Sequence, residues 1–306
     1  MLLSNGFRII AFLISYREYM MEEEKNMKKR NLLTLALTAL LVCSGCGGAQ
    51  DSLEDGVLTI GMECAYPPYN WTETSQSEDN VKITDGQGYA YGYDVIVAKE
   101  LAEYLDVTLE IKAISWDGLI PALESNTIDA IVAGMTDTPK RRNSISFSNE
   151  YYHSQMVIIT KDVEEYKSFD SIDDFAGLKF IAQLGTVQAD LIDSLGDSTS
   201  ESYAGIVAGT HTKTYPEAFM ALESNACDAV ICEAPEAEQF LASHPTGYLD
   251  TVLEGNDDFV VSISVGVRKN DSSLQTKINE FLAGISEEQR QQWMQEAIAS
   301  APGATE

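Results

Sequence analysis

The sequence ALESNTIDAIV, residues 122–132, returns almost unchanged as ALESNACDAVI, residues 221–231. In each copy a helical pattern ends in a polar Ser-Asn pair and leads into a short apolar strand rich in β-branched residues. A single repeat at the spacing of a domain predicts two similar α/β lobes, because a solenoid needs several short repeats. The alternative is chance similarity between two amphipathic helix–strand units.

Polar residues follow both repeated strands. Gly134-Met135-Thr136 come after the first copy, and Glu233 comes after the second. In open α/β sheets, ligands bind beyond the carboxyl ends of the strands. We therefore expect these two strand ends to face each other across a cleft between the lobes.

The rest of the chain alternates strands with helices, which predicts parallel sheets. Strands are expected at 57–62, 108–113, 128–133, 155–159, 179–182, 228–231 and 259–267. Helices are expected at 93–105, 117–124, 187–195, 215–223, 273–283 and 287–299. The polar segment 72–88 is expected to form an exposed hairpin or loop. We assign 57–154 to lobe 1, 155–260 to lobe 2, and 261–306 to the second part of lobe 1 with the C-terminal helices.

The composition narrows the class of partner. The 306 residues carry 48 acidic and 20 basic side chains, a net charge of −28. This charge excludes nucleic acid as a partner and repels an anionic membrane surface. The histidines are scattered and the cysteines lack the spacing of a metal site, so we expect no metal and no cofactor. Cys64, Cys227 and Cys232 are an odd set and do not make a disulfide framework.

The N-terminal region has the order of a secretory signal. Lys28-Lys29-Arg30 precede an apolar run, Leu32 to Val42, that is too short to span a bilayer. The segment VCSGC, residues 42–46, resembles a bacterial lipobox, with cleavage before Cys46 and a lipid on its thiol. We expect a signal peptide over 1–45, with the true start at Met27, and a lipidated tether over 46–56. The alternative is a short anchor helix that is not cleaved.

Side chains near the strand ends complement a zwitterion. Arg141 offers a planar fork of donors that matches a carboxylate, with the Thr136 hydroxyl nearby. Glu233 offers an acceptor for an ammonium group. Read separately, the basic turn 140–142 is more typical of a solvated helix end, and Glu233 of a surface carboxylate. Aromatic residues lie near other strand ends and could instead belong to the core: Tyr66, Tyr69 and Trp116.

With these motifs in place, the chain resembles the type II periplasmic solute-binding proteins of polar amino acid ABC transporters. The matching pieces occur in order over nearly all of residues 57–300. They are LTIG at 58–61, YPPY at 66–69, GYDV at 92–95, WDGLIPAL at 116–123, DAI at 129–131, GMT at 134–136, TP at 138–139, Arg141, FS at 147–148, YY at 151–152 and LGT at 184–186.

The resemblance implies two Rossmann-like α/β lobes joined by two hinge strands, near Ser154–Val157 and Val260–Ser264, with the ligand in the cleft between the lobes. It also implies a monomer, anchored outside the cytoplasmic membrane by the lipid on Cys46, that delivers an amino acid to an ABC transporter permease.

The resemblance also assigns roles to site residues. Arg141 would clamp the ligand α-carboxylate, helped by Thr136 and the backbone around Thr186. The Gly134 carbonyl and Glu233, where the family usually has Asp, would hold the α-ammonium group. Val187 stands where several relatives have a hydroxyl residue, so one contact with the carboxylate is lost.

The side-chain end of the pocket is expected to be polar. By resemblance, Tyr66, Tyr69 and Trp116 line it, and Glu63 falls where binders of basic amino acids often carry Asp. A carboxylate buried without a partner is costly, so the site should favour a basic or amide side chain and reject an acidic one. Two other functions remain open: a dehydratase on the same fold, and a ligand-sensing module.

Overall fold

The computed structural model describes residues 53–252 and 260–303. The expected signal peptide over 1–45, the start at Met27 and the lipid-bearing Cys46 lie outside these residues. Among the helices that the model describes, none is long and apolar enough to cross a bilayer.

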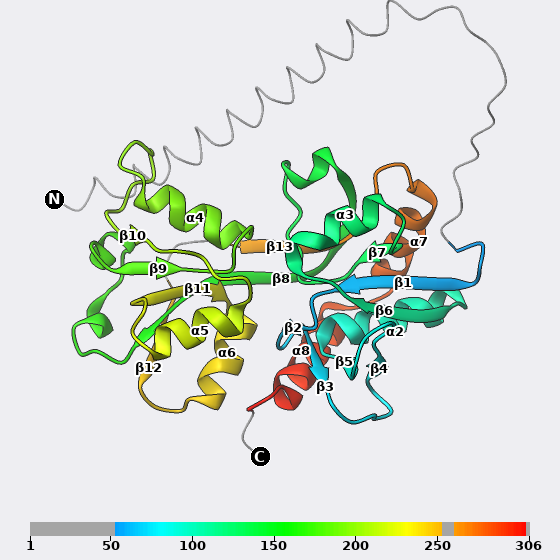
Figure 1. Cartoon of the computed structure of the whole chain (residues 1–306), viewed down its shortest axis with the longest axis horizontal. Coiled ribbons are helices and arrows are strands. Elements are labelled where there is room, and N and C mark those ends of the chain that lie inside the picture. Colours follow the sequence, from blue (N-terminus) through cyan, green and yellow to red (C-terminus); the bar gives the residue numbers. More distant parts are fainter. Residues whose placement is uncertain (1–52, 253–259, 304–306) are drawn as a thin grey trace, which may run out of the picture.

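Two α/β lobes share one large mixed sheet (Figure 1). Its order is β10-β9-β11-β8-β13-β7-β1-β6, and β12 pairs with β8. The strands of this sheet are β1 (Val57–Met62), β6 (Thr108–Ala113), β7 (Ala130–Ile131), β8 (Ile145–Lys161), β9 (Lys179–Ile181), β10 (Val207–Ala208), β11 (Ala229–Glu233), β12 (Tyr248–Thr251) and β13 (Val260–Arg268). The predicted two-lobed α/β fold is thus confirmed.

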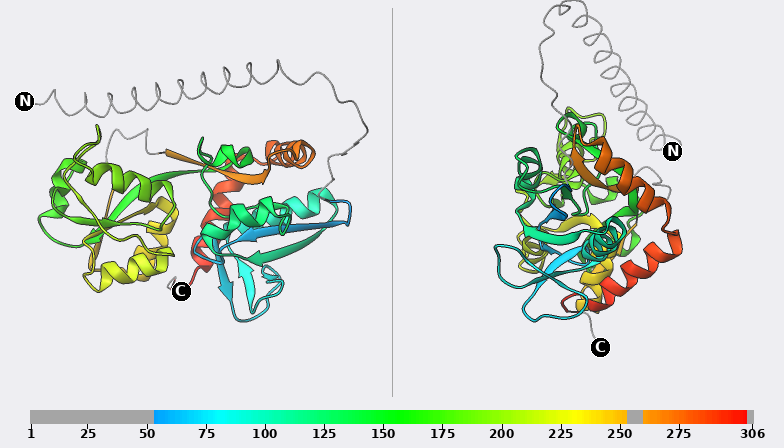
Figure 2. Two further views of the ribbon diagram at one scale, coloured as in Figure 1. Left: turned by 45° about the horizontal axis from the view of Figure 1, so that its top comes forward. Right: turned by 90° about the vertical axis from the view of Figure 1, so that its right-hand side faces the viewer.

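Helices cover the sheet in both lobes, as Figure 1 shows. In lobe 1 they are α2 (Tyr93–Leu105), α3 (Leu119–Glu124) and α7 (Ser272–Ala283), and in lobe 2 they are α4 (Val187–Gly196), α5 (Tyr215–Glu223) and α6 (Ala234–Ser243). The last helix, α8 (Glu287–Ser300), packs against both α2 and α6 and so contacts both lobes (Figure 2). Short 3-10 turns lie at Trp116–Gly118, Arg141–Asn143, Tyr166–Ser168 and Ile172–Phe175.

Strands β8 and β13 pass between the lobes. β8 pairs with β13 as far as Gln155 and with β11 from Met156 onward, antiparallel in both cases. This change of partner lies inside the segment that the resemblance assigns to the first hinge. The facing residues of β13, Val260 and Val261, lie in the segment assigned to the second hinge. The hinge function itself remains a prediction.

The sequence repeat corresponds to a structural repeat. Asn126 ends the turn after α3 with φ 57°, and Asn225 does the same after α5 with φ 61°. Asparagine tolerates this left-handed conformation better than most residues. In both copies, the alanine that opens the repeat then accepts a hydrogen bond from the residue after that asparagine, at 2.9 Å and 2.8 Å.

The aspartate of each copy ties its strand to the next one. The Asp129 carboxylate accepts from the Thr59 N–H at 3.0 Å, and the Thr59 carbonyl accepts from the Asp129 N–H at 2.8 Å. Asp228 and Lys179 exchange the same pair of bonds in lobe 2, at 2.8 Å and 2.9 Å. Chance similarity does not explain a repeat that preserves these contacts.

Some elements differ from the expectation. The segment 72–88 contributes to a small antiparallel sheet of β2 (Ala65–Tyr66), β3 (Asn70–Glu73), β4 (Val81–Lys82) and β5 (Tyr89–Tyr91). The strand expected at 128–133 is only two residues long, whereas the one expected at 155–159 is part of the 17-residue β8. The full length of β8 was not predicted, because polar residues occupy most of its exposed and half-buried positions and interrupt the apolar pattern. Helix α6 was missed because Pro235 and its acidic neighbours resemble a loop, although proline is tolerated in a first helical turn.

Candidate functional site

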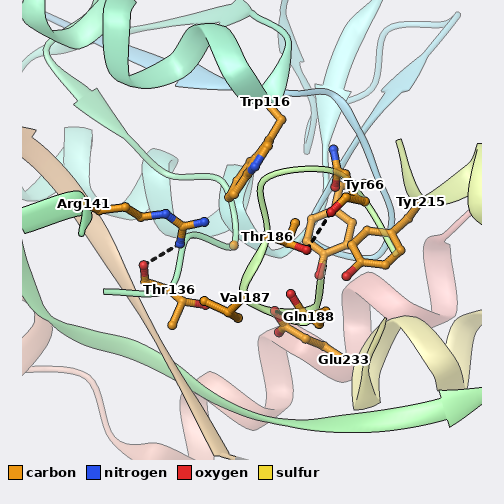
Figure 3. A pocket seen from close by; sticks show the side chains of 11 residues that line it. Tyr66, Trp116, Thr136, Arg141, Thr186, Val187, Gln188, Tyr215 and Glu233 are labelled. Atoms are coloured by element: carbon orange, nitrogen blue, oxygen red, sulfur yellow. Dashed lines mark hydrogen bonds between the residues drawn. The ribbon is translucent and has the colours of Figure 1, made fainter. Parts of the chain in front are cut away.

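A pocket lies where the strand ends of the two lobes meet (Figure 3). Lobe 1 lines it with Tyr66, Trp116, Gly134, Thr136 and Arg141, and lobe 2 lines it with Gln183, Thr186, Val187, Gln188, Tyr215 and Glu233. The pocket therefore brings together the site residues predicted from the sequence, apart from Glu63 and Tyr69. Those two lie behind its wall.

Arg141 forms the positive end of the pocket. Its Nη1 donates to the Thr136 carbonyl at 2.6 Å, and its Nη2 donates to the Gly185 carbonyl of lobe 2 at 3.1 Å. The guanidinium carbon lies 5.1 Å from the centre of the Trp116 ring, a cation–π arrangement. Burial lowers the pKa of Arg141 to about 10, so the group stays cationic at neutral pH.

The start of α4 faces this arginine. Thr186 caps the helix, because its hydroxyl accepts from the Ala189 N–H at 3.2 Å. Val187 and Gln188, the first two residues of the helix, line the pocket. A helix N-terminus carries unpaired N–H groups and a partial positive charge that favour an anion. Arg141 and this helix end together suit a carboxylate.

Glu233 forms a negative end of the pocket. It is the last residue of β11 and the residue before α6, and only 2% of its surface is exposed. Its carboxylate accepts from the Tyr69 hydroxyl at 2.7 Å and from the Gln188 amide at 3.3 Å. Burial raises its pKa to about 7. A cation bound beside it would oppose this effect and favour the charged carboxylate.

Aromatic rings form the wall between the two lobes. Tyr66 stacks between Tyr69, at 4.8 Å between ring centres, and Tyr215 of lobe 2, at 5.3 Å. Figure 3 shows the Tyr66 and Tyr215 rings side by side, with Trp116 approaching the pocket from another direction. Tyr69 is fully buried behind Tyr66 and contacts the site through Glu233 instead.

Glu63 lies behind Gln183 at another edge of the pocket. The Gln183 amide donates to both oxygens of Glu63, at 2.9 Å and 3.0 Å, and to the Lys213 carbonyl at 2.8 Å. Burial, opposed by the bond from Gln183, raises the pKa of Glu63 to about 7. A second, partly buried acceptor thus lies at a distance from Glu233.

Three lining residues were missed by the sequence analysis: Gln183, Gln188 and Tyr215. Tyr215 could have been found from the repeat, because it stands in the second copy where Trp116 stands in the first. The two glutamines carry no such signal. Cys64, Cys227 and Cys232 are buried free thiols. Over residues 53–252 and 260–303, no group of three His, Cys, Asp or Glu side chains could hold a metal ion.

Known proteins resemble the chain over nearly its whole described length. The family described as bacterial extracellular solute-binding proteins, family 3, matches residues 58–297. The L-arginine-binding protein of Pseudomonas aeruginosa is 30% identical, over 74% of this chain and 81% of that protein. The arginine-binding extracellular protein of Bacillus subtilis is 28% identical, over 84% and 92%. The structure of an ancestral arginine-binding protein bound to arginine superposes with a TM-score of 0.64 at 28% identity, covering 79% of this chain and 97% of that one.

Proposed function

Because the chain belongs to the bacterial extracellular solute-binding proteins of family 3, we propose that it captures an amino acid with a basic side chain between its lobes and delivers it to an ABC transporter. The single observation that carries the proposal is the distribution of charge around the pocket. One cationic group, Arg141, lies at one end, and two separate carboxylates, Glu233 and Glu63, lie at others.

The main-chain part of an amino acid matches the first two groups. Its α-carboxylate would bind Arg141 and the N-terminus of α4, where Thr136 and Thr186 also lie. Its α-ammonium group would bind Glu233 and the Gly134 carbonyl. Each ligand charge then meets an opposite charge in a buried site, where an unpaired charge would be costly.

The side chain of the ligand would extend along the aromatic wall toward Gln183 and Glu63. A guanidinium or ammonium group there would give the Glu63 carboxylate a positively charged partner, and no such partner is among the described groups that shift its pKa. Tyr66, Tyr215 and Trp116 offer flat faces on which a guanidinium group can stack. The relatives named as arginine-binding proteins support the basic class, with arginine as the first candidate.

The protein would act by binding and not by catalysis, as its relatives named for binding do. Closure would bend the chain at 154–157 and 260–264, with lobe 1 formed by 57–154 and 261–306 and lobe 2 by 155–260. We place the protein outside the cytoplasmic membrane as a monomer, held there by the lipid on Cys46.

Isothermal titration calorimetry with the twenty amino acids and with ornithine tests the proposal. We expect arginine, lysine or ornithine to bind most tightly, and aspartate and glutamate to be rejected. Mass analysis of the ligand after incubation should find it unchanged. Tight binding of an acidic amino acid would refute the charge assignment, and conversion of the ligand would favour the dehydratase alternative.

A further inference from the structure

A buried chain of hydrogen bonds runs from the pocket backbone into lobe 1. The Gly134 N–H donates to the Tyr151 hydroxyl oxygen at 3.0 Å, and that hydroxyl donates to Asp94 at 2.6 Å. The other Asp94 oxygen accepts from the Asn70 amide at 2.8 Å, and the Asn70 oxygen accepts from the Cys64 N–H at 2.7 Å. Asp94 is 0% exposed.

The direction of each bond in this chain is fixed. A carboxylate can only accept, so the single Tyr151 proton must point toward Asp94. The Tyr151 oxygen is then left as an acceptor, and the Gly134 N–H is the donor that reaches it. Burial raises the pKa of Asp94 to about 6, which is still below neutral pH, so the carboxylate is mostly ionised at pH 7.

Gly134 has no side chain, so it lines the pocket with its main chain. Its φ is +61°, and a Cβ atom there would lie 2.8 Å from the Tyr66 ring. Among the residues that the structure describes, no donor reaches the Gly134 carbonyl oxygen. The N–H of this residue is therefore held on the interior side, while its carbonyl remains available.

We propose that Tyr151 and Asp94 are positioning residues, which hold Gly134 so that its carbonyl accepts a hydrogen bond from the ligand α-ammonium group. The inference rests on the proposed function and deepens it. The same carboxylate, through Asn70, also fixes the backbone of Cys64, next to Glu63. One buried anion thus aligns the acceptors for both cationic groups of a basic amino acid.

Tyr151→Phe tests the proposal, because it removes only the hydroxyl. The matched control is Tyr93→Phe, since Tyr93 is as buried as Tyr151, at 0% against 1% exposed, and its hydroxyl donates one hydrogen bond, at 2.8 Å to the Tyr151 carbonyl. Binding of arginine and of its des-amino analogue, which lacks the α-ammonium group, is measured for each protein. Hydrogen exchange of the Gly134 amide is measured without ligand.

We expect Tyr151→Phe to weaken arginine binding about 10-fold or more, because the hydrogen bond from the charged α-ammonium group to the Gly134 carbonyl is lost. The des-amino analogue does not make this bond, so its binding should weaken less than about 3-fold. Tyr93→Phe should change both affinities by the same small factor. In Tyr151→Phe the Gly134 amide should exchange at least about 10-fold faster. If Tyr151→Phe does not fold, Asp94→Asn should show the same selective loss.

Equal weakening of both ligands, or an unchanged Gly134 exchange rate, would overturn the positioning role. The exchange result does not depend on the ligand, so it separates this failure from failure of the proposed function. If another amino acid proves to be the ligand, its own des-amino analogue replaces that of arginine in the comparison. If the unmodified protein binds no amino acid, both the proposed function and the ammonium role are wrong.

Discussion

Replacing Arg141 by alanine should abolish detectable amino acid binding without unfolding the protein. The guanidinium group donates to carbonyls of both lobes and is buried deeply enough to lower its pKa to about 10. In the variant, a ligand carboxylate would be buried without its charged partner. Truncating one member of such a pair costs about 2–5 kcal/mol, which corresponds to about a 30- to 5,000-fold loss of affinity.

The neighbouring arginine provides the matched control. Arg142 pairs with Asp137, and its side chain is 65% exposed, so Arg142→Ala should weaken binding less than about 5-fold. Calorimetry gives both affinities, and thermal unfolding of the free proteins checks that each variant is folded. Equal losses in the two variants, or tight binding by folded Arg141→Ala, would refute the reasoning.

Three further predictions follow from the acidic groups and the N-terminus. Glu63→Gln should cost a basic ligand at least about 10-fold in affinity and a neutral one little, and calorimetry showing equal losses would contradict the charge role. The pKa values of Glu63 and Glu233 are raised from 4.5 to about 7, so the folded protein binds more protons than the unfolded chain between these values. The melting temperature of the ligand-free protein should therefore fall as pH rises through this window, and it should fall less steeply in Glu63→Gln. The affinity for a basic ligand should rise over the same window, and a tighter complex at pH 5 than at pH 8 would be inconsistent with this sign. Cys46→Ser should move the protein from the membrane to the soluble fraction, and retention after a carbonate wash would disprove the lipid anchor.

Local patterns in the sequence were enough to predict most of the fold. The observed first and last residues of α2 and α5 are the ones that the apolar periodicity predicts, because each helix buries one face against its own lobe. The position of Arg141 and Glu233 after strands was also sufficient to place them at the cleft. These inferences need only the order of elements along the chain and the rule that ligands bind at strand ends.

Contacts between the lobes could not be predicted in this way. Gln183 bonds to Glu63, and Tyr215 stacks on Tyr66, only because the two lobes meet at a particular angle. Side-chain patterns within one lobe do not encode that angle. Tyr69 shows the converse error, since its motif was recognised but its ring is one layer behind the pocket surface.

The antiparallel pair of β8 and β13 limits how the two lobes can move. A ladder of hydrogen bonds joins the strands from Ile145 to Gln155, so neither strand can slide along the other without breaking several bonds together. Bending and twisting, which paired strands accommodate readily, need not break them. If the lobes close on a ligand as proposed, this linkage would act as a flexural joint and not as a sliding one, and ligand binding would change the angle between the lobes. A membrane partner that contacts both lobes would sense occupancy as the spacing of two rigid surfaces, without touching the ligand.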